Sequence, residues 1–398
     1  MTTTINNGHK KLNVPNLRFP EFEGEWKEER LADIADLYKG TGISKDQLSD
    51  DGEPCILYGE LYTKYKSETI REAISKTNID NTKLVRSKAN DVIIPCSGET
   101  AEDIATARCV LNGNILLGGD LNIIRLHGYD GTFMSYQLNG KRKYDIAKVA
   151  QGVSVVHLYG EHLKGVKTIN PCLAEQKKIA SFLTLLDERI ATQNKIIEDL
   201  KMLKSAISNY LFTRKELLET TICLADIATL KNGYAFKSTK HNTLGQWKIL
   251  TIANVSGERY INDDDCNCII NLPKDIQDYQ VLNEGDILIS LTGNVGRVSL
   301  CKAGNYLLNQ RVGLLHITKD VNQEFLFQIL SSRKFENSMV ACGQGAAQMN
   351  IGKGDVESYV LPYSSNINNI RMIAEILQSY DEFIINEQRT RTLLTMQK

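Results

Sequence analysis

The sequence predicts an α+β protein with a pseudo-twofold internal repeat: two similar mixed α/β domains separated by two long helices that pair antiparallel as a coiled coil. Three observations support this fold class. Matching segments recur at a nearly constant offset, short β-rich runs precede a long helix, and the apolar residues of both long helices follow a seven-residue period. A chain of 398 residues is also too long for one small core, so at least two domains are expected.

The internal repeat is visible in short matching segments. Residues 31–35 (LADIA) return as residues 224–228, and Gly40 returns as Gly233, both at an offset of 193 residues. Later matches keep the same order, and the offset drifts by only two residues. Chance matches would not preserve both order and offset, so the chain is two copies of a unit of about 190 residues. The later matches join residues 91–94 to 286–289, 97–98 to 292–293, 151–152 to 344–345, and 187–188 to 381–382.

Each copy begins with a β-rich region and ends in a helix. In the first copy, short aliphatic runs cover Asp91–Pro95 and residues 114–117 and 122–126, and Gly, Asn and Asp residues separate them. This pattern predicts short strands joined by turns. Residues 175–212 contain no Gly or Pro, which predicts one helix of about 57 Å at about 1.5 Å per residue.

A coiled-coil seam is predicted along both long helices. Its positions recur every seven residues, and Gln193 and Glu387 occupy equivalent places where polar groups set the register. An antiparallel pair is favoured, because a parallel pair would require the second globular region to traverse the helix length. The alternative is that each long helix packs only on its own domain. The predicted seam residues are Ile179, Leu183, Leu186, Ile190, Gln193, Ile197, Leu200, Ile373, Leu377, Tyr380, Ile384 and Glu387.

Composition excludes several classes of protein. Hydrophobic residues make up 42% and charged residues 24% of the chain, and no segment has the roughly 18 unbroken apolar residues of a membrane span. The first 11 residues lack the apolar core of a secretory signal, so we expect a cytoplasmic protein without a membrane partner. The nine cysteines show no disulfide or zinc-site spacing, which favours reduced thiols and no metal site. The net charge of −1 requires any nucleic-acid contact to use local basic surface.

No catalytic motif is recognisable, so no catalytic residue is predicted. Residues 170–172 (NPC) lack the second proline and the aromatic residue of an adenine methyltransferase motif, and residues 345–353 lack the spacing of a phosphate-binding loop. Residues 175–177 (EQK) resemble a nuclease carboxylate–lysine pair but lie at a helix start, where we interpret them as first-turn electrostatics. The chain is therefore expected to perform no covalent chemistry alone.

Several loops combine basic, amide and aromatic residues, which suits contact with DNA bases and phosphates. The loops differ between the copies, as in residues 41–43 (TGI) against 234–236 (YAF), so two reading units would read different half-sites of an asymmetric, split target. Half-sites about one helical turn apart, roughly 34 to 36 Å, would lie on one face of the duplex. The candidate DNA-binding residues are Lys39, Thr41, Lys45, Tyr58, Tyr62, Lys64, Lys66, Lys231, Asn232, Tyr234, Lys237, Thr292, Asn294, Arg297, Asn309, Gln310 and Arg311.

Certain motifs resemble a known family. Residues 14–22 (VPNLRFPEF) with Trp26 look like the family's N-terminal entry, and residues 345–351 (GAAQMNI) with Pro362 look like its junction between recognition domain and helix. In the first copy, residues 152–158, Pro171 and residues 175–176 fill that role. Over nearly its whole length, the chain resembles the specificity subunit of type I restriction-modification systems.

The resemblance implies two target-recognition domains held apart by antiparallel spacer helices. It also implies two kinds of partner, double-stranded DNA and two methyltransferase subunits. The methyltransferase subunits would flip an adenine in each half-site and use S-adenosylmethionine. Motor-nuclease subunits using ATP and Mg would complete the complex, and this chain would hold no cofactor and catalyse nothing. The implied domains are an N-terminal segment (1–25), recognition domain 1 (26–172), a central spacer helix (173–213), recognition domain 2 (214–364) and a C-terminal spacer helix (365–398).

Two departures from an exact repeat are visible. The first helix extends to about residue 212, whereas the second ends at the equivalent of Lys204, where the family usually carries another short apolar stretch. Residues 97–106 are acidic where the second copy has residues 292–298 (TGNVGRV), so equal contact roles are not expected. Two alternatives to a DNA-reading subunit stay open: a stand-alone DNA methyltransferase or nuclease, and a coiled-coil assembly adaptor that never touches DNA.

Overall fold

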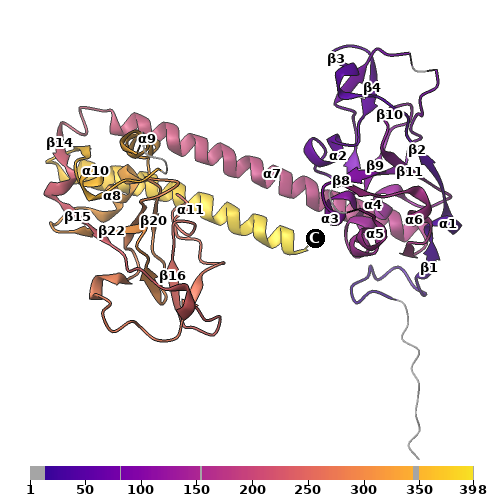
Figure 1. Cartoon of the computed structure of the whole chain (residues 1–398). Helices are drawn as coiled ribbons and strands as arrows, with labels where there is room; N and C mark the ends of the chain where they lie inside the picture. The colour runs from indigo at the N-terminus through magenta and orange to yellow at the C-terminus, as the bar shows by residue number, and fades with distance from the viewer. Residues whose placement is uncertain (1–13, 81, 153–154, 344–348, 398) are drawn as a thin grey trace, which may run out of the picture. The chain divides into compact units, whose positions relative to one another are not determined.

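A computed structural model describes residues 14–80, 82–152, 155–343 and 349–397 (Figure 1). The chain divides into two compact units, unit 1 (Met1–Arg189) and unit 2 (Ile190–Gln397). One uninterrupted helix, α7 (Leu173–Phe212), begins in unit 1 and ends in unit 2. Residues 344–348, which carry one of the repeat matches and part of the GAAQMNI motif, and residues 153–154 of the corresponding first motif lie outside the described residues.

Unit 1 is a mixed α/β unit, as the fold class predicts. Its short helices are α1 (Leu31–Ile34), α2 (Glu60–Thr63), α3 (Ala101–Ile104), α4 (Gly131–Asn139), α5 (Lys143–Val149) and α6 (Gly160–Lys164), with a 3-10 turn at Lys45–Gln47. Its strands are β1 (Lys27–Arg30), β2 (Ala35–Lys39), β3 (Leu48–Ser49), β4 (Glu53–Ile56), β5 (Thr69–Ile70), β6 (Ser75–Thr77), β7 (Asp91–Pro95), β8 (Ser97–Gly98), β9 (Arg108–Val110), β10 (Leu116–Leu117), β11 (Leu121–Leu126), β12 (Val156–His157) and β13 (Lys167–Asn170).

Unit 2 repeats this plan. Its helices after α7 are α8 (Gln323–Leu330), α9 (Arg333–Cys342), α10 (Lys353–Glu357) and the long α11 (Ile367–Gln397), with 3-10 turns at Leu224–Asp226, Ser238–Lys240 and Asp278–Gln280. Its strands are β14 (Thr220–Cys223), β15 (Ala228–Asn232), β16 (Trp247–Leu250), β17 (Asn267–Ile269), β18 (Val281–Leu282), β19 (Ile287–Ser290), β20 (Val298–Leu300), β21 (Tyr306–Leu308), β22 (Val312–Ile317) and β23 (Val360–Tyr363).

The sheets have matching topology in the two units. The order β2-β11-β7-β9 in unit 1 corresponds to β15-β22-β19-β20 in unit 2, and every neighbouring pair in both runs is antiparallel. In the second sheet, β4 pairs in parallel with β10, as β16 does with β21. The internal repeat inferred from sequence offsets is therefore a repeat of strand order and direction.

The central strands β7 and β19 of the repeated sheet are buried on both faces. Neighbouring residues on one strand point to opposite faces, and on β7 Ile93 packs in one buried cluster while Ile94 packs in another. On β19, Leu288 and Ile289 divide between two clusters in the same way. Strands covered on both sides tolerate few substitutions, so variation between the copies is expected mainly in the loops.

The repeated glycine has a steric role in both units. Gly40 follows β2, and a Cβ atom there would lie 2.0 Å from the carbonyl oxygen of Gly118. Gly233 follows β15, and a Cβ atom there would lie 2.1 Å from the carbonyl oxygen of Asn309. The next residue in each case donates its backbone N–H across this contact, from Thr41 to Leu117 and from Tyr234 to Leu308. The close approach of two backbones explains why this glycine recurs.

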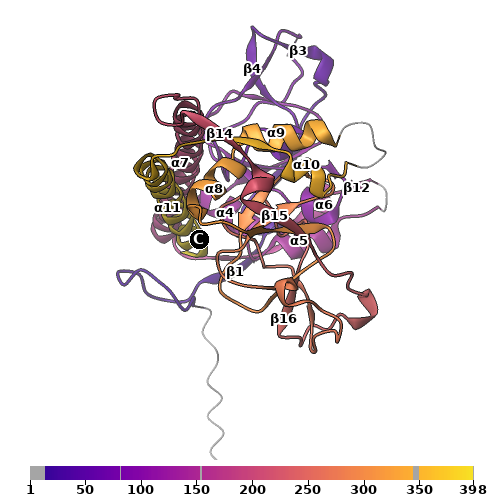
Figure 2. The same cartoon turned by 90° about the vertical axis from the view of Figure 1, so that its left-hand side faces the viewer.

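The long helices α7 and α11 lie side by side within unit 2, as both views show (Figures 1 and 2). Gln193 of α7 donates to the carboxylate of Glu387 and, at 3.3 Å, to its carbonyl oxygen. Nearer the start of α11, Asn369 donates to the carbonyl oxygen of Leu217, which follows α7, at 3.1 Å. The residue numbers on the two helices therefore run in opposite directions, and the predicted antiparallel pairing is confirmed.

The predicted seam positions are covered to different degrees. Gln193, Ile197, Ile373, Leu377 and Ile384 are buried. The other predicted seam residues are half-buried, and none of them is fully exposed. The half-buried members are Ile179, Leu183, Leu186, Ile190, Leu200, Tyr380 and Glu387.

The start of α11 is tied to the segment that follows α7. The Glu219 carboxylate accepts hydrogen bonds from the Ser364 hydroxyl at 2.7 Å and from the Ser365 N–H and hydroxyl at 2.7 and 2.8 Å. These donors stabilise the charged form, and they lower the pKa of Glu219 to about 2. The carboxylate thus anchors the turn that leads into α11.

We expect Gly40→Ala and Gly233→Ala to destabilise their units, because the added Cβ would overlap backbone atoms that cannot rotate away. Overpacking of this kind costs about 1–3 kcal/mol. The control is Gly42→Ala, where a Cβ atom would meet nothing within 4 Å. Chemical denaturation should show a lower free energy of unfolding for the first two variants only, and equal values for Gly40→Ala and Gly42→Ala would contradict the steric argument.

The depressed pKa of Glu219 predicts a pH-dependent contribution to stability. Because the folded pKa lies below the unfolded value of 4.5, the contribution is fully present above about pH 4.5 and disappears as the pH falls through about 2. Thermal unfolding of wild type and Glu219→Gln should therefore differ most at pH 7 and converge at acid pH. Glu216→Gln, which alters a neighbouring exposed carboxyl group, is the control. A pH-independent gap for Glu219→Gln would argue against the anchor.

Candidate nucleic-acid interface

The candidate residues gather at one edge of the repeated sheet in each unit. Neighbouring strands in this sheet are antiparallel, so the ends of β2 and β7 and the starts of β9 and β11 lie at the same edge of unit 1. In unit 2 the ends of β15 and β19 and the starts of β20 and β22 share the corresponding edge. We call these the loop edges of the two units. Segments far apart in the sequence meet there.

In unit 1, several candidates lie at the loop edge and are exposed. Lys39 ends β2 and lies 3.7 Å from Asp120, which precedes β11. Lys45 is in the 3-10 turn after β2, and Tyr58 and Lys66 flank α2. All four side chains are solvent-accessible, so phosphates or bases could reach them.

Other candidates in unit 1 are held by contacts within the unit. Lys64 donates to buried Glu60 at 2.8 Å and to Ser75 at 2.7 Å. Tyr62 donates its hydroxyl to the carbonyl oxygen of Ser97 at 2.9 Å, and burial raises its pKa. This bond fixes α2 against the segment that follows β7. Thr41 accepts a hydrogen bond from the N–H of Val85 at 3.0 Å. These side chains shape the loop edge, and their contact with DNA remains a prediction.

An aromatic group at this edge was not among the predicted residues. β12 pairs with β8, which brings His157 Nδ1 within 3.2 Å of the Ser97 hydroxyl. The ring of Tyr159 stacks on that of His157, with centroids 6.1 Å apart and planes 19° apart, and Tyr159 is 49% exposed. An exposed aromatic face suits stacking on a nucleic-acid base. One feature of the sequence pointed to this segment: residues 151–152, just before it, match residues 344–345 after α9 in the second copy.

In unit 2 the structure brings the predicted segments together. Tyr234 forms a β-bridge with Asn309, and Gln310 donates its N–H to the carbonyl oxygen of Tyr234 at 3.0 Å. Leu291 donates its N–H to the carbonyl oxygen of Arg311 at 3.1 Å, which joins the segment before Thr292 to the same group. Three loops predicted separately therefore form one surface.

The side chains on this surface differ in how firmly they are held. The Tyr234 hydroxyl donates to Asp275 at 2.9 Å, which raises its pKa, and Thr292 donates to Asn350 at 3.1 Å. Arg297 lies 3.5 Å from Glu336 of α9. Lys231 lies over the ring of Tyr279 at 5.7 Å. The exposed candidates of unit 2 are Asn232, Lys237, Asn294, Gln310 and Arg311, while Asn309 is half-buried.

The two loop edges present different chemistry. In unit 1 the connection after β7 forms α3, whose first turn carries Glu102 and Asp103 and is capped by Thr100. In unit 2 the equivalent connection is a tight turn in which Gly293 and Gly296 have positive φ angles of 75° and 77°. The backbone difference follows from these glycines, because few other residues adopt that conformation. The two edges therefore differ in backbone shape and in the charge that their connections carry.

The first turn of α7 is more than a set of helix-end charges. Glu175 is 0% exposed and accepts two hydrogen bonds of 2.7 Å from Arg18, and Trp26 donates to it at 3.3 Å. Gln176 is buried, accepts from the N–H of Asp130 at 2.9 Å and donates to Pro171 at 2.8 Å. These residues attach the N-terminal segment and the sheet-bearing part of unit 1 to α7. The interpretation of residues 175–177 as first-turn electrostatics was therefore incomplete.

Within the described ranges, no group of three or more His, Cys, Asp or Glu side chains has the arrangement of a metal site. Likewise, the helices described there include none that is long and apolar enough to cross a membrane. All nine cysteines are free thiols, and burial raises the pKa of Cys109 and Cys301 to about 12.

A family model described as the type I restriction modification DNA specificity domain matches the chain twice, over residues 23–202 and 219–395. The chain belongs to this specificity family. Each match takes in one copy of the internal repeat, with its loop edge and most of its long helix. Within type I restriction-modification systems, the chain is therefore a specificity subunit.

Known members of the specificity family are similar along almost their whole length. The chain is 25% identical over 394 residues to the specificity subunit of the type I restriction enzyme MjaVIII of Methanocaldococcus jannaschii, covering 92% of this chain and 88% of that protein. The fold is similar to the crystal structure of the S subunit of a type I system from M. genitalium, with a TM-score of 0.61, 16% identity, and coverage of 94% and 93%. It is also similar to a chain from a structure described as the basis of complex assembly and conformational transition of the type I system, with a TM-score of 0.55, 15% identity, and coverage of 96% of both chains.

We predict that Arg311→Ala weakens binding of the assembled complex to duplex DNA of arbitrary sequence. If Arg311 contacts one phosphate, the slope of log affinity against log salt should decrease by about 0.9. The matched control is Lys353→Ala, which removes an exposed cation of α10 that lies 3.6 Å from Glu357. Titrations at several salt concentrations check this. An unchanged slope for Arg311→Ala, or an equal change for both variants, would remove Arg311 from the interface.

Proposed function

We propose that this specificity subunit reads a bipartite, asymmetric DNA target, with one half-site at each loop edge, and holds the subunits that modify or cut the DNA. Specificity subunits act with DNA and with other subunits in a complex. The proposal of a bipartite, asymmetric target rests on one observation. The sheet is duplicated with matching topology but unlike loops, and one continuous helix runs between the two copies. Equal frameworks with unequal loops suit two readers of two different sequences.

The reactions are assigned to other polypeptides. Two methyltransferase subunits with S-adenosylmethionine would methylate one adenine in each half-site, and motor-nuclease subunits with ATP and Mg would cut unmodified DNA. This chain would contribute base and phosphate contacts and a scaffold. The recognition domains (26–172 and 214–364) and spacer helices (173–213 and 365–398) are proposed as the units of these roles, with the N-terminal segment 1–25 as an accessory contact.

The charge distribution of the chain supports a model in which its partner subunits supply part of the affinity for DNA. The formal net charge is −1, and at the loop edges basic side chains lie near carboxylates, as Lys39 does near Asp120 and Arg297 near Glu336. Non-specific affinity for DNA grows with the number of phosphates that a protein neutralises. A near-neutral reader is therefore expected to depend on its partner subunits for much of the affinity, while its loops supply sequence preference.

Exchange of recognition domain 1 tests the proposal. Residues 26–172 are replaced by the corresponding domain of another specificity subunit, the complex is expressed in a host, and modified adenines are mapped across the genome. We expect one half of the target to change and the other half to stay the same. An unchanged map would favour an assembly adaptor that does not touch DNA, and a single uninterrupted target would contradict the bipartite reading.

A second measurement addresses the enzyme alternative. The purified chain, without partner subunits, is incubated with duplex DNA and a labelled methyl donor, and a parallel reaction contains Mg without the methyl donor. We expect neither label transfer nor DNA cleavage, whereas either activity would favour a stand-alone methyltransferase or nuclease.

A further inference from the structure

We propose that Asp187 of α7 and Asp381 of α11 are positioning residues, each of which fixes the sheet-bearing part of its own unit at one angle on a long helix. Through these two angles they would determine which separation between half-sites the complex accepts. The inference rests on the proposed function, because a separation has meaning only for a chain that reads two half-sites.

The two aspartates are equivalent by sequence, and so are their partners. Residues 187–188 and 381–382 are one of the matched blocks of the internal repeat. The partner of Asp187 is Tyr136 of α4, and a partner of Asp381 is Gln328 of α8. Both helices follow the matching strands β11 and β22.

The capping residues fix this correspondence of α4 and α8. Asp130 caps α4 by accepting from the N–H of Phe133, and Asn322 caps α8 by accepting from the N–H of Phe325, each at 2.8 Å. Tyr136 and Gln328 are both the sixth residue after the cap. The repeat has therefore kept a contact between helix and sheet-bearing part while changing the donor from a phenol to an amide.

In unit 1 the joint is a short polar contact. The Tyr136 hydroxyl donates to Asp187, and the Tyr136 side chain is only 9% exposed. Burial and the neighbouring carboxylate raise the pKa of Tyr136, so the phenol stays protonated and can donate. One residue along the helix, Glu188 forms an ion pair with Arg71. Donors from two parts of the sheet-bearing region thus meet adjacent carboxylates on α7.

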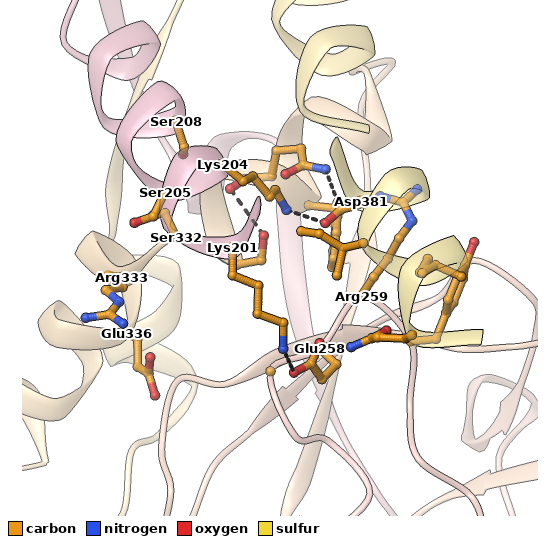
Figure 3. Close-up of a pocket in the computed structure, with 18 of the residues that line it drawn as sticks. Lys201, Lys204, Ser205, Ser208, Glu258, Arg259, Ser332, Arg333, Glu336 and Asp381 are labelled. Atoms are coloured by element: carbon orange, nitrogen blue, oxygen red, sulfur yellow. Dashed lines mark hydrogen bonds and ion pairs between the residues drawn. The ribbon is translucent and has the colours of Figure 1, made fainter. Parts of the chain in front are cut away.

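In unit 2 the joint is a buried ionic cluster (Figure 3). The Asp381 carboxylate accepts from Lys204 of α7 at 2.6 Å, from Gln328 at 2.7 Å and from Arg259 at 3.0 Å. Arg259 also donates to both carboxylate oxygens of Glu324 of α8 at 2.7 Å, and its guanidinium group lies 5.3 Å from the ring centroid of Phe327. Asp381 is 6% exposed and Gln328 is 2% exposed.

In unit 2 this geometry gives the joint a single satisfied orientation. The donors to Asp381 come from α7, from α8 and from the loop before β17, so a rotation of one element would break at least one bond. A buried carboxylate that loses a donor keeps the cost of its desolvation, and hydrogen bonds weaken steeply with misalignment. Apolar packing lacks this directional dependence. The polar joints are therefore the contacts that select an angle.

The two joints should differ in strength. In unit 2 the apolar residues of α11, including Ile373 and Leu377, belong to the same buried cluster as Phe325 of α8, so packing supports the joint. In unit 1 the described contacts of α7 with the sheet-bearing part are mainly polar, as at Gln176, Asp187 and Glu188. Loss of the Tyr136 hydroxyl in unit 1 is therefore expected to change the accepted half-site separation more than loss of the Gln328 amide in unit 2.

The test uses Tyr136→Phe, which removes one hydroxyl and keeps the ring, and Gln328→Met, which removes the amide and keeps the length. Each variant is expressed with its partner subunits, and modified adenines are mapped across a genome. We expect the share of sites with a spacer one base pair longer or shorter than in wild type to rise about tenfold for Tyr136→Phe. Tenfold corresponds to the loss of one hydrogen bond of ordinary strength. The rise should be smaller for Gln328→Met, and base identity within both half-sites should be unchanged.

Matched controls separate positioning from general stability. Tyr129→Phe removes a hydroxyl that donates to Glu29 at 2.9 Å within the sheet-bearing part, and Gln323→Met alters an exposed amide of α8 that donates to Gly285. Both should keep the wild-type spacer even where the unfolding temperature falls. If Tyr136→Phe yields no complex, Gln328→Met alone decides.

The outcomes test the positioning role of the two aspartates separately from the proposed bipartite reading of DNA. An unchanged spacer in both joint variants, an equal relaxation in the controls, or altered bases within a half-site would overturn the positioning role while leaving a bipartite reader intact. A wild-type map without two half-sites would instead contradict the proposed function itself.

Discussion

Attachment of each long helix to the sheet-bearing part of its own unit is the constraint on which the rest of the structure depends. In unit 2 that attachment is largely apolar. Leu377 of α11, Phe325 of α8 and Ile289 of β19 share one buried cluster, so the helix cannot separate from the sheet without exposing the core. The long helix is thus part of the domain that it carries.

In unit 1 the long helix is attached to the sheet-bearing part through polar contacts. Glu175, buried beneath Arg18 and Trp26, and Gln176, which bonds backbone groups on both sides, hold the start of α7. Buried polar groups are stable only when their partners are present, so this arrangement specifies one geometry. One duplicated framework therefore uses two different balances of packing and hydrogen bonding.

The duplicated sheet also explains where variation is tolerated. Its central strands β7 and β19 are buried on both faces, and Gly40 and Gly233 are held by close backbone contacts, so this part of the framework accepts few substitutions. The connections at the loop edge lie outside these constraints. One copy can therefore form the capped helix α3 where the other forms a glycine turn, and the sheet beneath keeps the same strand order.

Much of the framework could be predicted from local pattern. The predicted run 91–95 is β7, runs 114–117 and 122–126 overlap β10 and β11, and the predicted helix 175–212 lies within α7. Equivalent seam positions 193 and 387 meet, because an antiparallel pair of repeated helices brings equivalent residues together at its twofold axis. These features depend on periodicity and order along the chain, which the amino-acid sequence contains directly.

The roles of individual polar side chains could not be predicted in this way. Lys64 and Lys66 look alike in sequence, yet Lys64 donates to the buried carboxylate of Glu60 while Lys66 donates to the carbonyl oxygen of Tyr62. The position of His157 beside Ser97 depends on the pairing of β12 with β8, which the local sequence pattern does not predict.

Repeat, helices and seam follow from residue order, because hydrophobic period and chain length act locally. The choice of partner for each charge, such as Arg259 for Glu324 and Asp381, was decided only when folding brought distant elements together and removed water from between them.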